Sequence, residues 1–95
     1  MVVVSMGERG AVGMDSSGRA WWAGARLDQP VVDAVGSGDA LGGGWVVAEA
    51  RRERFPDALR LGVACGAANT LVAGAGHCRR SDIDRLAAQA EVREV

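Results

Sequence analysis

The sequence contains no lysine, and all 11 of its basic residues are arginines. A Walker A loop needs a lysine to hold the β- and γ-phosphates of a nucleotide, so this class of phosphate site is excluded. The 11 basic residues are offset by 12 acidic ones, which leaves a formal net charge of −1 at pH 7. A nucleic-acid-binding surface requires a basic excess, so we expect no nucleic acid among the partners.

Cysteine and histidine are scarce too, with only Cys65, Cys78 and His77. They lack C-x-x-C spacing and are too few for a zinc site, so we expect no protein-bound metal and free thiols. A signal peptide would begin with a basic stretch, which is missing. No apolar run reaches the about 20 residues that cross a bilayer. These absences predict a soluble, cytoplasmic protein without membrane contact.

The length of 95 residues corresponds to one globular domain at most. Its first residues, Val2-Val3-Val4-Ser5, form a β-branched run typical of a strand buried on both faces of a parallel sheet. Such a strand needs neighbours on both sides, and a chain this short supplies only part of them. We therefore expect an incomplete sheet and interpret the chain as a fragment.

Glycine, by contrast, is abundant, with 14 residues, and one glycine turn organises the chain. A predicted strand at Val31-Val32 leads to Gly36, Ser37 and Gly38, and a predicted helix follows. Glycines let backbone N–H groups face a ligand, and a helix start adds unpaired N–H groups and a positive dipole end. The pattern predicts an anion site. Asp39 beside it either accepts a proton from an attacking hydroxyl or merely caps the helix.

The stretch Asp33-Ala34-Val35-Gly36-Ser37-Gly38-Asp39 resembles the D-T-x-G-A-G-D signature of the PfkB (ribokinase-like) carbohydrate kinases. It is most similar to the 1-phosphofructokinase and tagatose-6-phosphate kinase branch, with Ala34 in place of the usual threonine. The resemblance implies that Asp39 is the catalytic base that contacts the substrate hydroxyl. It also implies that the amides of Gly36, Ser37 and Gly38 form an anion hole, with ATP and Mg²⁺ as cofactors. A sugar phosphate would be the substrate, and the full-length enzyme a homodimer.

A second glycine motif follows the first predicted strand and resembles the S/T-x-G-x-x-G nucleotide loop of the same family. The resemblance assigns ATP contacts to Ser37, Gly38, Asn69 and this loop, which comprises Ser5, Met6, Gly7, Glu8, Arg9 and Gly10. Asn69 lies in a predicted helix whose counterpart in the family lies along the adenine slot. An amide that bonds a nearby loop carbonyl is an equally good interpretation of Asn69.

The remaining pattern completes an α/β chain, which the resemblance makes the C-terminal part of a ribokinase-like three-layer sandwich. Strands at 11–14 and 19–23 flank a hairpin turn, and adjacent Trp21 and Trp22 would point to opposite faces. Consecutive glycines at 42–44 cost helix stability, which predicts close approach of a nucleotide or a strand. Further elements are expected as helices at about 38–52, 56–72 and from 81, and an edge strand at 92–95.

Two alternatives to the kinase hypothesis remain from the residues alone. The spacing Gly36-x-Gly38-x-x-x-Gly42 is compatible with a loose dinucleotide-binding turn, although the acidic residue expected about 20 residues later at a strand end is missing. The chain could also be a non-catalytic remnant. Because the sugar-binding part of the family is absent from the sequence, we expect the fragment alone to be inactive.

Overall fold

The computed structural model describes residues 1–27, 29–34, 36–74 and 78–95. Val35 of the glycine turn and His77, which the sequence favours as a plain loop residue, lie outside the described residues. No helix in the described ranges is long and apolar enough to cross a membrane. The elements are β1 (Val2–Ser5), the 3₁₀ helix η1 (Gly7–Arg9), β2 (Ala11–Met14), β3 (Ala20–Gly24), α1 (Ser37–Ala50), α2 (Phe55–Asn69), α3 (Arg80–Gln89) and β4 (Glu91–Glu94).

The four strands form one antiparallel sheet in the order β1-β2-β3-β4. The predicted hairpin and the returning tail strand are confirmed, but the parallel, doubly buried environment predicted for β1 is wrong. Only five residues separate β1 from β2 in the sequence, whereas a parallel crossover needs a dozen or more. Val2 and Val4 are also 60% and 52% exposed, because no described element covers their face of the sheet.

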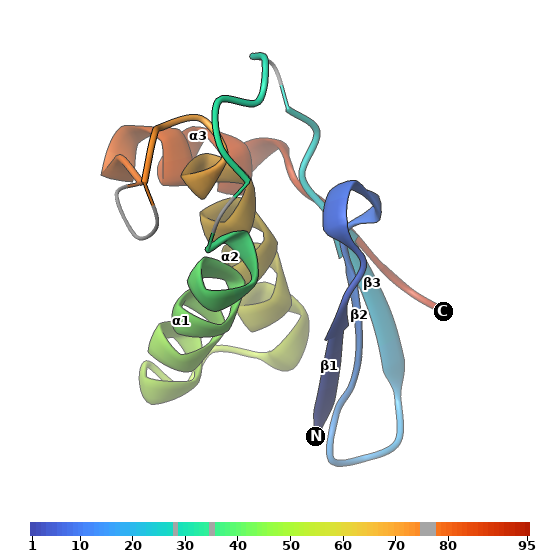
Figure 1. Ribbon diagram of the computed structural model, residues 1–95. Coiled ribbons are helices and arrows are strands. Elements are labelled where there is room, and N and C mark those ends of the chain that lie inside the picture. Colours follow the sequence, from blue (N-terminus) through green and yellow to red (C-terminus); the bar gives the residue numbers. More distant parts are fainter. Residues whose placement is uncertain (28, 35, 75–77) are drawn as a thin grey trace.

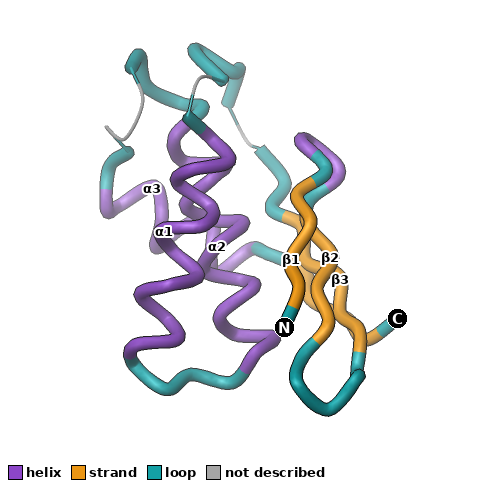
Figure 2. Tube along the Cα trace, turned by 60° about the horizontal axis from the view of Figure 1, so that its bottom comes forward, coloured by secondary structure: helices purple, strands orange, loops and turns teal. Residues whose placement is uncertain are grey.

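The helices cover one face of the sheet (Figure 1). The main core cluster lies between α2 and the sheet, where Leu59 and Phe55 pack with Ala11 and Ala23. Figure 2 shows α1 and α2 running side by side, with the sheet on one side of this pair. The α/β class and the incomplete sheet are therefore confirmed, and the described residues supply two of the three expected layers.

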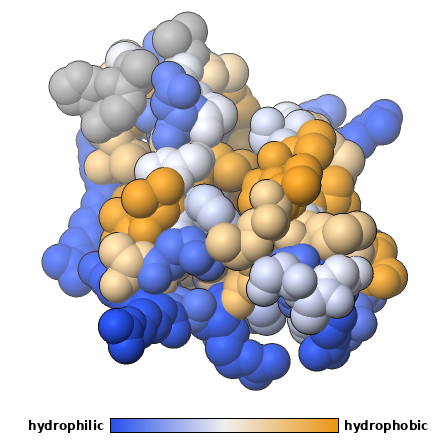
Figure 3. All heavy atoms as spheres, turned by 90° about the horizontal axis from the view of Figure 1, so that it is seen from below, coloured by the Kyte–Doolittle hydropathy of each residue, from blue (hydrophilic) through white to orange (hydrophobic). Residues whose placement is uncertain are grey.

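The two tryptophans of β3 lie on opposite faces of the sheet, as predicted. Trp21 packs against the main core cluster, whereas Trp22 is paired with Val12 and Arg93 in the register of the sheet. In Figure 3 apolar atoms gather on the sheet side of the molecule, and the exposed apolar side chains of this side include Val2 and Met14.

Helices α1 and α2 approach closely at glycines. A Cβ on Gly44 would lie 2.7 Å from the Sγ of Cys65, and one on Gly62 would lie 3.1 Å from a carbonyl oxygen of α1. A Cβ added to Gly42 or Gly43 would have nothing within 4 Å. The predicted close approach therefore occurs at Gly44 alone of the three consecutive glycines, and its neighbour is a helix rather than a nucleotide or a strand.

The predicted strand at Val31-Val32 is wrong. This segment is irregular, and its backbone bonds the end of α2: the N–H groups of Val32 and Asp33 both donate to the carbonyl of Thr70, at 2.7 and 3.1 Å. A helix end offers carbonyl groups that lack helical partners, and the segment uses one of them instead of a neighbouring strand. Helices α1 and α2 end two to three residues earlier than predicted, at Ala50 and Asn69.

Candidate functional site

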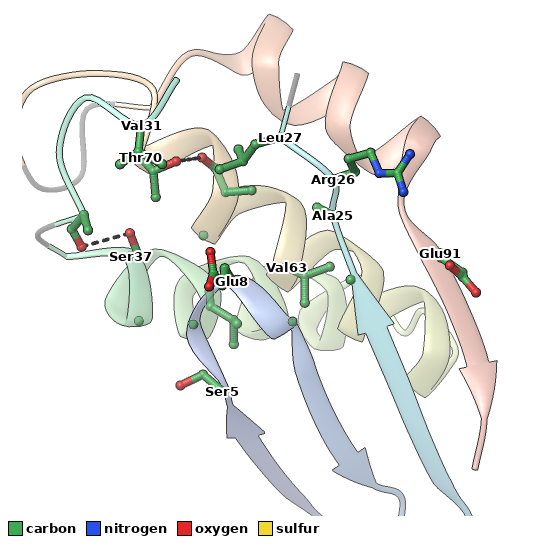
Figure 4. Close-up of a pocket in the computed structure, with 18 of the residues that line it drawn as sticks. Ser5, Glu8, Ala25, Arg26, Leu27, Val31, Ser37, Val63, Thr70 and Glu91 are labelled. Atoms are coloured by element: carbon green, nitrogen blue, oxygen red, sulfur yellow. Dashed lines mark hydrogen bonds between the residues drawn. The ribbon is translucent and has the colours of Figure 1, made fainter. Parts of the chain in front are cut away.

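A cleft of about 1210 Å³ opens between the sheet and the helices. Figure 4 shows its walls, which are the loop after β1, the segment that leaves β3, the start of α1 and the face of α2 that carries Val63. Seven residues of the two predicted glycine motifs line it together: Ser5, Gly7, Glu8, Gly10, Ala34, Ser37 and Gly38. The fold thus brings two motifs that are about 30 residues apart in the sequence to one cavity.

The other predicted site residues do not line the cleft. Met6 and Arg9 belong to the loop after β1 but do not face the cavity, while Gly36 and Asp39 flank the two residues of the turn that do. Asn69 is fully buried at the end of α2 and is engaged within the protein. A fully buried amide cannot reach a nucleotide without a rearrangement, so the geometry favours the internal interpretation of Asn69.

The loop after β1 is closed by its own backbone. The N–H of Met6 donates to the carbonyl of Gly10 at 2.8 Å, and the N–H of Gly10 donates to the carbonyl of Gly7 at 3.1 Å. Gly10 has a φ of +88°, and a Cβ there would lie 2.1 Å from the carbonyl oxygen of Ala23 in β3. Only glycine fits this position, so the loop ends in a fixed place against the sheet.

The glycine turn before α1 has a more open structure. Gly36 precedes the helix with a φ of +81°, which favours glycine, and its carbonyl accepts the N–H of Ala40 at 2.9 Å. Ser37 turns back to Ala34, whose carbonyl accepts both its N–H at 3.3 Å and its Oγ–H at 3.0 Å. A Cβ added to Gly38 would have nothing within 4 Å.

An anion at this helix start would meet N–H groups that have no helical partner. The first-turn N–H groups of a helix lack intrahelical acceptors, and the helix dipole adds partial positive charge there. The N–H of Ser37 is shared with Ala34, and among the described residues no acceptor is found for the amides of Gly38 and Asp39, which makes these two amides candidate donors to an anion. The arrangement fits a phosphate held by backbone rather than by cations.

Asp39 is exposed in the first turn of α1, next to the cleft-lining Gly38. Within the described residues its carboxylate takes part in no hydrogen bond and no ion pair. A carboxylate with both oxygens available can accept a proton from a hydroxyl brought to it. The observed N-cap of α1 is Gly36, and no side chain bonds the helix start, so Asp39 does not cap the helix.

Among the charged side chains that line the cleft, acidic ones outnumber basic ones. Glu8 and Glu91 line it together with a single cation among the described lining residues, Arg26. No group of three or more potential metal ligands occurs in the described ranges.

Thr70 and Trp22 are among the cleft residues that sequence reasoning did not assign to the site. The Thr70 carbonyl holds the segment that leads into the glycine turn, and the carboxylate Oδ2 of Asp33 fastens the same segment by accepting the N–H of Gly74 at 3.2 Å. Trp22 lines the cleft from β3. Neither Thr70 nor Trp22 lies in a motif, so no signal in a single sequence points to them.

The chain is similar to known proteins over most of its length. The pattern of the family described as "pfkB family carbohydrate kinase" matches residues 1–82. The chain is 33% identical over 88 residues to the ATP-dependent 6-phosphofructokinase isozyme 2 of Escherichia coli, covering 90% of this chain and 27% of the relative. The isozyme 2 of Mycobacterium tuberculosis is 34% identical over 86 residues, covering 90% of this chain and 25% of the relative.

A solved structure of phosphofructokinase-2 from Escherichia coli, in complex with potassium, superposes with a TM-score of 0.81 at 31% identity. The superposition covers 90% of this chain and 27% of that one, so the chain spans about a quarter of the length of the relatives that it matches. The family match covers most of the chain and includes both glycine motifs that line the cleft. The chain belongs to the pfkB family of carbohydrate kinases.

Proposed function

We propose that this chain provides the ATP site, the anion hole and the catalytic base for phosphoryl transfer to a hydroxyl of a sugar phosphate. The observation that carries the proposal is the convergence of two glycine motifs on one cleft, with an available carboxylate beside it. The names of the relatives, ATP-dependent 6-phosphofructokinases, support a hexose phosphate as the acceptor and ATP as the donor.

The cleft accommodates a nucleotide by shape and polarity. Val63 and Ala67 of α2 line it together with Leu27 of the segment after β3, which gives an apolar lining for a base. Ligand pockets commonly have volumes of roughly 300–1,000 Å³, and this open cleft is somewhat larger. We place the phosphates between the loop at 5–10 and the start of α1, where backbone N–H groups are available.

The reacting end of the site lies at the start of α1. Asp39 would accept the proton of the attacking sugar hydroxyl while the amides of the turn stabilise negative charge on the transferred phosphoryl group. Mg²⁺ would neutralise the nucleotide phosphates when bound. The signature of the turn resembles the 1-phosphofructokinase branch, whereas the relatives are named 6-phosphofructokinases. Fructose 1-phosphate and fructose 6-phosphate are therefore the two acceptors to compare.

Titration calorimetry with ATP tests the anion site directly. Gly38→Val fills the open space in front of the first-turn amides, so we expect weaker ATP binding by the folded variant. Gly43→Val is the matched control, because Gly43 lies on the same helix, also faces open space and does not line the cleft. Unchanged affinity in Gly38→Val, or an equal loss in both variants, contradicts the proposal, and preferential binding of NAD would favour the dinucleotide alternative.

A further inference from the structure

The indole of Trp22 reaches from the middle of the sheet to the loop at 5–10. Its Nε1–H donates to the carbonyl of Arg9 at 2.9 Å. The ring passes over Gly24, where an added Cβ would lie 2.5 Å from the indole Cζ2 atom. A side chain at position 24 would thus occupy the place of the ring, so Gly24 makes room for Trp22 to lie along its own strand toward the loop.

The strand that carries Trp22 has a paired strand on each side. Trp22 belongs to β3, with Val12 of β2 and Arg93 of β4 as its register partners. The guanidinium carbon of Arg93 lies 4.6 Å from the centroid of the indole ring. Such a cation–π contact stabilises one orientation of the ring. The strand pairing and the Arg93 contact thus orient the indole independently of the loop.

The loop meets β3 at two points, and each has a different chemistry. One is the backbone contact of Gly10 with Ala23, which leaves no space for a side chain. The other is the bond from Trp22 to Arg9, the last residue of η1 and the neighbour of Gly10. Between them they determine where the cleft-lining part of the loop, at Gly7 and Glu8, stands relative to α1.

We propose that Trp22 is a positioning residue for the nucleotide loop. Its indole N–H fixes the carbonyl of Arg9 and thereby sets the distance between the loop and the anion turn at the start of α1. This inference rests on the proposed nucleotide role of the cleft. Trp22 also lines the cleft, so a nucleotide bound there changes the surroundings of the same indole.

The adjacent tryptophan supplies a matched control. Trp21 lies on the opposite face of the same strand and packs against the core. Its Nε1 is 3.4 Å from Asp15 Oδ2 in the hairpin turn, and Arg19 lies 5.2 Å from its ring centroid. Trp21 thus has the same kinds of partner as Trp22, but it makes no contact with the loop and does not line the cleft.

The experiment compares Trp22→Phe with Trp21→Phe in the 95-residue chain. Phenylalanine keeps an aromatic ring for the arginine contact and removes the N–H donor. Amide hydrogen exchange by NMR measures the opening of residues 6–10, urea unfolding measures overall stability, and calorimetry measures the affinity for ATP. In Trp22→Phe we expect exchange in the loop to rise and ATP affinity to fall by roughly 2- to 10-fold, the factor that corresponds to one net hydrogen bond. Trp21→Phe should change neither.

Each outcome decides a separate claim. Unchanged loop exchange in Trp22→Phe overturns the positioning role, and so does equal acceleration in both variants, which would be general destabilisation. Weaker ATP binding with unchanged loop exchange also overturns it, because Trp22 would then contact the nucleotide directly. If the unaltered chain binds no ATP but Trp22→Phe accelerates loop exchange, the positioning of the loop stands and the proposed nucleotide function fails. Gly24→Ala, which displaces the ring without removing the donor, should reproduce the effect of Trp22→Phe.

Discussion

The two glycine turns that border the cleft differ in how much of their structure the protein itself determines. The loop after β1 is closed by backbone hydrogen bonds, pressed against Ala23 at Gly10 and held by the indole of Trp22. The turn before α1 is shaped by Gly36, but Gly38 and Asp39 beyond it are exposed. In the loop the N–H groups of Met6, Arg9 and Gly10 are bonded within the loop itself, while the other turn leaves the Asp39 carboxylate exposed.

The difference suits the loop after β1 to binding a ligand and the turn before α1 to proton transfer. A group that must hold a ligand in a fixed place benefits from a prearranged loop, because ordering it on binding would cost affinity. A group that must exchange a proton needs a carboxylate that is not already bonded within the protein. Under the proposed function, the comparison therefore predicts that changes in the loop affect folding and affinity, whereas loss of the exposed Asp39 carboxylate affects turnover.

The largest effect is expected for Asp39→Asn, in an enzyme where this segment replaces the matching segment of the Escherichia coli relative. Asparagine keeps the shape but cannot take up the proton, so kcat should fall by roughly 10²–10⁴, the range for loss of a positioned base. Because Asp39 is exposed and makes no hydrogen bond in the described part of the chain, unfolding should be unchanged. Steady-state kinetics and urea unfolding check both, and unchanged kcat would remove Asp39 from the mechanism.

Gly10→Ala should break the other side of the comparison. A methyl group there would lie 2.1 Å from a backbone oxygen, at a φ of +88°. Strain of this kind belongs to the mechanisms that exceed the usual 0.5–3 kcal/mol of a point mutation, so we expect a loss of roughly 3 kcal/mol or more in the free energy of unfolding. Gly18→Ala is the control, since it has the same φ of +88° but open space around it. Equal losses in both variants would mean that the contact with Ala23 is unimportant.

A smaller effect is expected where the exposed turn is fastened to α2. Asp33→Ala removes the acceptor for the N–H of Gly74, a hydrogen bond with a net value of about 1 kcal/mol, and the change should cost at least that much because Asp33 is engaged elsewhere in the protein too. The segment should then move more freely, and ATP affinity should fall while the hydrogen exchange of the loop at 5–10 stays the same. Exchange measured in both regions checks this, and a change in both would show that the two turns are coupled.

The smallest effect concerns the hairpin turn that joins β2 and β3. The Asp15 carboxylate accepts the Ser17 hydroxyl at 2.6 Å and the N–H groups of Ser17 and Arg19, and these bonds lower its pKa from 3.8 to about 2. A lowered pKa means that the carboxylate stabilises the hairpin fully above pH 3.8 and loses this effect as the pH falls through about 2. An NMR titration of the Asp15 carboxyl should show that midpoint, and a midpoint near 3.8 would exclude these bonds in solution.

The sequence predicted the two glycine motifs and the elements around them because these depend on local chemistry. The hairpin at 15–18 follows from its turn residues, and the helix at α1 from its glycine start. The strand at Val31-Val32 was predicted from β-branched residues alone, and it is wrong because no strand in the described part of the chain pairs with this segment. Its hydrogen-bond partner, the Thr70 carbonyl, lies at the end of α2, and no local sequence pattern indicates such a contact.

Within the site, the sequence could indicate which residues carry the chemistry but not how they are supported. Glu8 and Gly38 were predicted as members of motifs, and both line the cleft. The buried position of Asn69 depends on how α2 packs on α1 and the sheet, which a helical pattern cannot give. The support that Trp22 gives to Arg9 depends on a long side chain that crosses a glycine, a relation visible only in three dimensions.

The spacing of α1 and α2 also bears on which glycines can vary. A Cβ added to Gly44, Gly62 or Gly66 would lie within 3.2 Å of an atom of the other helix, whereas Gly38 and Gly43 have open space there. If these positions are randomised and the library is selected for folding alone, glycine should be retained at 44, 62 and 66, whereas other residues should be accepted at 38 and 43. Selecting the same library for ATP binding should recover Gly38 but not Gly43, which would distinguish a glycine retained for packing from one retained for its ligand.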